Sequence, residues 1–120
     1  MASHNELGKK GEKIAIDFLN NNGYLILETS WRHNHKEIDI IALYYDILIF
    51  VEVKTRRTSY WGKPQEFVNI KKQKFLVEAS ESYINLKGFN GNSRFDVIDI
   101  VLNGDNYIVE HIINAFYPGV

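Results

Sequence analysis

Two strand-like segments near the middle of the chain carry charged side chains that could act together on a substrate. Asp39 lies in the run Glu-Ile-Asp-Ile-Ile at residues 37–41, and Glu52 and Lys54 lie in Ile-Phe-Val-Glu-Val-Lys at residues 49–54. Residues two apart in a strand share a face, so Glu37 lies beside Asp39 and Glu52 beside Lys54. The surrounding residues are nearly all apolar, as in buried central strands. An unpaired carboxylate there loses much of its hydration or takes up a proton, so these acids need a partner.

A divalent cation is one such partner. Mg²⁺ binds one or two carboxylates together with waters and phosphate oxygens, so Asp39 and Glu52 would hold Mg²⁺ or Mn²⁺ next to a phosphate group. Lys54 would orient a metal-bound water or neutralise charge that develops in the transition state. The alternative is structural, with Glu52 and Lys54 as an ion pair on an exposed sheet face and Asp39 as their cross-strand partner. These residues alone favour neither interpretation.

Glu12 shifts the balance toward the metal site. It belongs to a predicted helix in which 100° spacing places it at the edge of the apolar arc. Gly8 and Gly11 lie in that arc without side chains, so the helix could approach the sheet and present Glu12 to the same site. The alternative is a surface acid near a helix start, where the helix dipole favours negative charge. The apolar arc consists of Leu7, Gly11, Ile14, Ala15, Phe18 and Leu19.

Hydrophobic periodicity divides the chain into seven elements. It predicts helices over residues 5–22 and 66–86, and strands over residues 24–31, 37–43, 47–54, 94–102 and 107–112. Short connections favour an antiparallel meander for the first three strands. The intervening helix favours a fourth strand parallel to an earlier one. The predicted fold class is α/β, a mixed β-sheet flanked by helices in the order α-β-β-β-α-β-β, as one domain over residues 1–120.

Composition limits the class of protein. The chain has 120 residues with 45% hydrophobic content, which is enough for a buried core. It contains no cysteine, which excludes thiolate metal sites, and its four histidines show no metal-ligand spacing. No apolar run approaches the roughly 20 residues that cross a bilayer. We therefore expect a cytoplasmic protein that does not enter the membrane.

Charge is distributed unevenly. The net charge is −1, but residues 1–75 hold 12 of the 14 lysines and arginines. Cations that could follow a nucleic-acid backbone are Arg56, Arg57, Lys63 and the run Lys71-Lys72-Gln73-Lys74, with Tyr60 and Trp61 available to stack on bases. The alternative is an ordinary surface loop and a solubilising start of the second helix. On the fourth strand, Arg94 and Asp96 share a face and are expected to form a structural ion pair.

The spacing of the charged residues resembles a known nuclease pattern. Asp39, 12 intervening residues and then Glu52-Val53-Lys54 are similar to the divided Asp…Glu-X-Lys motif of the PD-(D/E)XK superfamily, which includes restriction endonucleases and archaeal Holliday-junction resolvases. More closely, the chain resembles the YraN-like family of small bacterial proteins. That resemblance rests on five blocks at residues 8–15, 37–41, 50–56, 94–97 and 114–116, which together span nearly the whole chain.

The resemblance implies a restriction-endonuclease-like sheet with Asp39, Glu52 and Lys54 as the metal and catalytic group. It also implies that Glu12 corresponds to the N-terminal helix acid of resolvase-like members, and that Gln73 could hydrogen-bond at the site, as a Gln does in some similar nucleases. The expected function is a Mg²⁺- or Mn²⁺-dependent endonuclease acting on DNA, including structured or branched DNA. A homodimer suits the symmetric cutting of two strands.

Two other functions remain open at this point. A nucleic-acid-binding adaptor could keep the nuclease fold without cleaving, in which case binding would persist with little effect of metal. The charges could also be purely structural, in which case no nucleic acid would bind.

Overall fold

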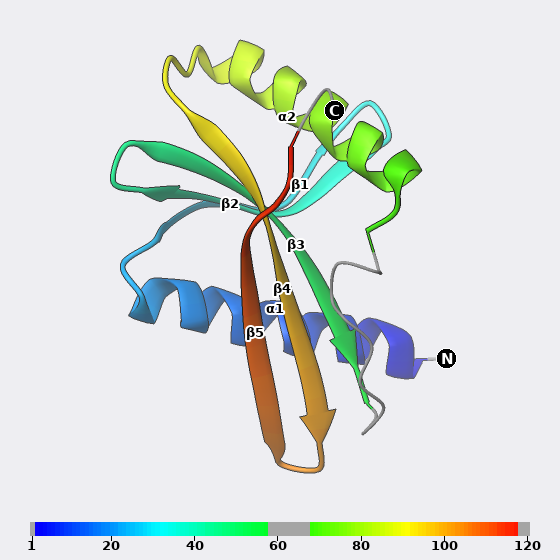
Figure 1. Ribbon diagram of the computed structural model, residues 1–120. Coiled ribbons are helices and arrows are strands. Elements are labelled where there is room, and N and C mark those ends of the chain that lie inside the picture. Colours follow the sequence, from blue (N-terminus) through cyan, green and yellow to red (C-terminus); the bar gives the residue numbers. More distant parts are fainter. Residues whose placement is uncertain (1, 58–67, 118–120) are drawn as a thin grey trace.

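The computed structural model describes residues 2–57 and 68–117, and the side chains of residues 6–57 and 68–117 within them. The described elements follow the predicted order α-β-β-β-α-β-β, which confirms the α/β fold class. Figure 1 shows the two helices on opposite faces of a twisted five-stranded sheet. The elements are α1 (Ala2–Asn21), β1 (Leu25–His33), β2 (Lys36–Tyr44), β3 (Ile47–Arg56), α2 (Ile70–Lys87), β4 (Ser93–Asn103) and β5 (Asn106–Phe116).

The strands lie in the order β1-β2-β3-β4-β5. The pairs β1–β2, β2–β3 and β4–β5 are antiparallel, while β3 and β4 are parallel, as the connecting helix predicted. Each face of the sheet has its own apolar core. One core packs α1 against the sheet through Ala15, Leu19, Ile49, Val51 and Ile98, and the other packs α2 through Leu76, Ala79, Tyr83, Phe50 and Val97.

The β2–β3 ladder ends early and opens a fork in the sheet. Its last pair toward the start of β2 is Ile40 with Val51, although β1 and β2 remain paired as far as His33 and Lys36. The β1–β2 arm therefore diverges from the second half of β3 (Figure 1). Asp39 is the first β2 residue inside this fork.

Gly11 sets the distance between α1 and the sheet. It is buried, and a Cβ atom at this position would overlap the side chain of Thr55 on β3. This confirms the prediction that a glycine permits close approach, because any side chain would push the helix outward. Gly8 does not contribute in this way, since it is exposed and a Cβ there would meet nothing within 4 Å.

Several predicted boundaries were wrong. The second helix begins at Ile70 rather than residue 66, because the Asn69 side chain accepts a hydrogen bond from Lys72 N at 2.8 Å and acts as the N-cap. Strands β1 and β2 extend into the segment predicted as a polar connection. They need only a two-residue turn at Asn34 and His35, whose φ values of 49° and 69° suit a tight hairpin.

A buried polar network anchors β5 to β4. Asp96 lies 3.0 Å from Arg94 Nε and 2.7 Å from His111 Nε2, and it accepts a hydrogen bond from Asn114 N at 3.1 Å. Burial alone would raise the pKa of Asp96, but the hydrogen bonds from His111, Arg94 and Asn114 hold it below its usual value. The predicted Arg94–Asp96 ion pair is therefore confirmed.

Within the described ranges, no helix has the length and hydropathy needed to cross a membrane.

Candidate active site

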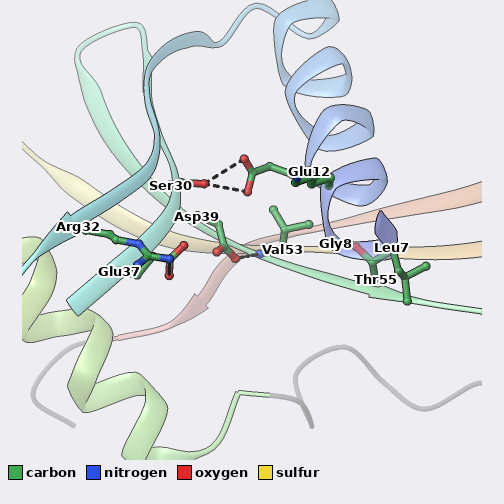
Figure 2. Close-up of a pocket in the computed structure, with 10 residues that line it drawn as sticks. Leu7, Gly8, Glu12, Ser30, Arg32, Glu37, Asp39, Val53 and Thr55 are labelled. Atoms are coloured by element: carbon green, nitrogen blue, oxygen red, sulfur yellow. Dashed lines mark hydrogen bonds and ion pairs between the residues drawn. The ribbon is translucent and has the colours of Figure 1, made fainter. Parts of the chain in front are cut away.

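A cleft of about 440 Å³ lies between α1 and the forked part of the sheet. Figure 2 shows its lining, with Glu12 contributed by α1, Ser30 by β1, Asp39 by β2 and Val53 by β3. The fork creates this space, because β2 no longer covers the edge of β3 beyond Val51. The complete lining is Leu7, Gly8, Lys9, Glu12, Ser30, Arg32, Glu37, Asp39, Val53 and Thr55.

The Asp39 carboxylate fills the narrow end of the fork. Its Oδ2 accepts a hydrogen bond from Val53 N at 2.8 Å, in the place where a continuous ladder would supply a β2 carbonyl (Figure 2). Burial is the largest influence on this carboxyl group, followed by the negative charge of Glu52. Together with smaller contributions from Glu12 and Glu37, they raise the pKa of Asp39 from 3.8 to about 7, against the opposing effect of the Val53 hydrogen bond.

Glu12 reaches the same cleft from the helix side. Its two carboxylate oxygens lie 3.3 and 3.5 Å from the Ser30 hydroxyl, which points toward them across the cleft (Figure 2). Ser30 has a φ of 48°, an unfavourable value for a residue with a side chain. Glu12 and Asp39 therefore line one cleft, whereas Glu52 and Lys54, predicted at the same site, do not line it.

Glu52 and Lys54 lie on the opposite side of β3 from this cleft. Glu52 is buried and its Oε2 lies 3.3 Å from Lys54 Nζ and 3.6 Å from Lys72 Nζ of α2. The predicted common face of Glu52 and Lys54 is confirmed by their ion pair. Glu52 does not line the cleft, although its charge contributes to the raised pKa of Asp39.

The carboxylates match the chemistry of a hard divalent cation. Mg²⁺ needs only one or two carboxylates from the protein and takes its other ligands from water and phosphate. The negative charge of Glu52 acts on Asp39, and Glu12 and Glu37 add further negative charge around it. A cation would relieve that repulsion. The described residues contain no group of three or more His, Cys, Asp or Glu side chains placed to hold a metal by themselves.

The predicted nucleic-acid contacts are dispersed. Arg56 is an ion-pair partner of Asp99 at 3.2 Å, and the Gln73 amide donates a hydrogen bond to Val68 O at 3.0 Å. Arg57 and Lys71 are exposed. Lys63, Tyr60 and Trp61 lie outside the described residues.

Four residues of the cleft or of the Glu52 ion pairs were not predicted in these roles from the sequence. Lys9, Ser30 and Arg32 line the cleft, and Lys72 pairs with Glu52 instead of simply extending a basic surface. The signal for Arg32 was available, since a tight turn at residues 34–35 places it opposite Glu37. No pattern in the sequence indicates that Ser30 adopts a positive φ.

Comparison with known proteins identifies the family. Residues 11–100 match the model described as "Uncharacterised protein family UPF0102". A UPF0102 protein from Flavobacterium johnsoniae is 46% identical over 98% of both chains, and one from Bacteroides thetaiotaomicron is 42% identical over 98% of both. A third relative, from Flavobacterium psychrophilum, is 44% identical with the same coverage. The matched region includes Glu12, Asp39, Glu52 and Lys54. The chain therefore belongs to the UPF0102 family.

Proposed function

We propose that this protein is a metal-dependent endonuclease that hydrolyses DNA phosphodiesters, including those of structured or branched DNA, in keeping with a YraN-like branch of the PD-(D/E)XK superfamily. The supporting observation is Asp39, a carboxylate that lines an open cleft and whose pKa is raised to about 7 by burial and neighbouring acids. A carboxylate with a strongly perturbed pKa inside a cleft is a candidate functional residue.

Asp39 and Glu52 would hold Mg²⁺ or Mn²⁺. The metal, when bound, would acidify a water molecule and polarise the phosphate. Glu12 stays oriented through the Ser30 hydroxyl and adds negative charge beside Asp39. Lys54 pairs with Glu52 on the opposite side of β3 from the cleft, so it would hold Glu52 in place and offset negative charge at the metal.

One observation favours a second candidate, the nucleic-acid-binding adaptor that does not cleave. Glu52 already has two cationic partners, Lys54 at 3.3 Å and Lys72 at 3.6 Å. Two lysines can neutralise a buried carboxylate without any metal. In that arrangement the fold would bind nucleic acid and Glu52 would serve only to stabilise the structure.

Two measurements separate these functions. The first is calorimetric titration of Mn²⁺ into wild-type protein and into Asp39→Ala, in which metal binding to wild-type alone establishes the site. The second is incubation of wild-type protein and Mn²⁺ with linear, single-stranded and four-way-junction DNA. Cleavage that disappears in Asp39→Ala supports the nuclease. Binding of DNA with no cleavage of any substrate supports the adaptor and refutes the enzyme.

A further inference from the structure

The cleft described above lies on the α1 side of the sheet and is called the α1-side cleft below. Two cations line it: Lys9 from α1 and Arg32 from the β1–β2 arm. Lys9 is exposed on α1 and has no ion-pair partner among the described residues. The Arg32 side chain is 76% exposed and lies 3.4 Å from Glu37 Oε1. An exposed ion pair of this kind contributes at most about 1 kcal/mol, so Arg32 can leave Glu37 for a phosphate at little cost.

The cations on the α2 side are held by buried acids instead. Lys54 and Lys72 both pair with Glu52, and Arg56 pairs with Asp99. These two acids have side chains only 6% and 4% exposed. Removing the partner of a buried charge is strongly unfavourable, so these cations are poorly suited to follow a mobile nucleic-acid backbone.

The position of Asp39 also favours the α1 side. Asp39 lines the cleft on the α1 side of the sheet, which gives a phosphate direct access to its carboxylate. The lining includes three acids, Glu12, Glu37 and Asp39, against the two cations Lys9 and Arg32. Without a metal ion this interior repels phosphate, whereas a divalent cation would reverse the balance.

We propose that nucleic acid lies across the α1-side cleft, with Lys9 and Arg32 holding backbone phosphates on either side of the one that reacts, and that this binding requires a divalent cation. The proposal deepens the proposed function and rests on it, because it identifies how the substrate enters that site. It replaces the α2-side cations of the sequence prediction with residues that the fold places on the other face.

The test is fluorescence anisotropy of a labelled four-way DNA junction in Ca²⁺, which permits binding while suppressing cleavage. The variant is the double change Lys9→Ala and Arg32→Ala. Its matched control is Lys10→Ala and Lys13→Ala, which removes the same charge from exposed positions of α1 outside the cleft lining. The cleft variant should weaken binding about tenfold per cation at 0.1 M salt and lower the slope of log K against log[salt] by about 2. The control should change both only slightly.

Every other result overturns some part of the proposal. Equal losses in both double variants would indicate bulk electrostatics, not a cleft. A larger loss in Arg57→Ala with Lys71→Ala would place the nucleic acid on the α2 side and leave the nuclease proposal intact. Unchanged binding in EDTA would refute the requirement for a cation. If wild-type protein binds no junction in Ca²⁺ and cuts none in Mn²⁺, the proposed function fails as well.

Discussion

Replacing Asp39 by asparagine should stabilise the folded protein, and the gain should grow with pH. The folded pKa of Asp39 is raised from 3.8 to about 7, so between these values the folded state holds a proton that the unfolded state releases. The free energy of unfolding therefore falls as the pH rises through this window. A tenfold change in proton affinity corresponds to about 1.4 kcal/mol, so the loss approaches about 4 kcal/mol at pH 8 and about 2 kcal/mol at pH 5.

Asparagine removes the ionisable group, while its amide oxygen can still accept the hydrogen bond from Val53 N. Urea unfolding of wild-type and Asp39→Asn at pH 5 and pH 8 isolates the effect, because every other titrating group is common to both proteins. The gap in unfolding free energy should widen by about 2–3 kcal/mol at the higher pH. A gap that does not change with pH would show that the fold does not raise the pKa of Asp39. Asp39→Ala is the control for the hydrogen bond, and should be about 1–3 kcal/mol less stable than Asp39→Asn because Val53 N loses its partner.

Two further predictions concern the packing of α1 on the sheet and the buried network around Asp96. Gly11→Ala should destabilise the protein by about 1–3 kcal/mol, since the new methyl group overlaps Thr55. Gly8→Ala is the control and should stabilise the helix by about 0.5–1 kcal/mol. Equal effects of the two substitutions in urea unfolding would contradict this account. Asp96→Asn should cost about 3–5 kcal/mol at pH 7 by leaving buried positive charge without its partner. Because the folded pKa of Asp96 is depressed, its contribution is present above the unfolded pKa and lost as the pH falls through the folded one, so the gap between wild-type and variant should shrink toward pH 3.

The order of elements and the grouping of charges along each strand could be predicted because they depend on local periodicity. Alternation in residues 49–54 places Glu52 and Lys54 on one face whatever lies around them, and the structure confirms it by their ion pair. Gly11 was likewise detectable, because a glycine on the apolar arc of a helix has few explanations other than close packing.

The arrangement of the site depends on contacts that local pattern does not contain. The ladder between β2 and β3 ends at Ile40, and next to that point Ile38 of β2 shares an apolar core with Tyr83 of α2, which is distant in the chain. The partners of Arg56 and Lys72 depend in the same way on which buried acids face them in the fold. The sequence therefore did not show that these two cations are already paired. Helix α2 began late because Asn69 acts as a cap inside an otherwise helical pattern.

The fork gives Asp39 two roles that need different chemistry. Ending the β2–β3 ladder leaves Val53 N without a backbone partner, and the Asp39 side chain supplies the missing acceptor. The same carboxylate faces the cleft, where a negative charge is useful only if a cation binds there. A neutral acceptor would serve the fold equally well, so the negative charge of Asp39, which burial and the neighbouring acids disfavour, destabilises the protein without improving its structure. Such a cost is expected at a functional site, where stability gives way to chemistry. Asparagine separates the two roles: a variant that folds more stably than wild-type yet no longer binds Mn²⁺ would assign the charge of Asp39 to function, whereas unaltered metal binding would remove Asp39 from the metal site.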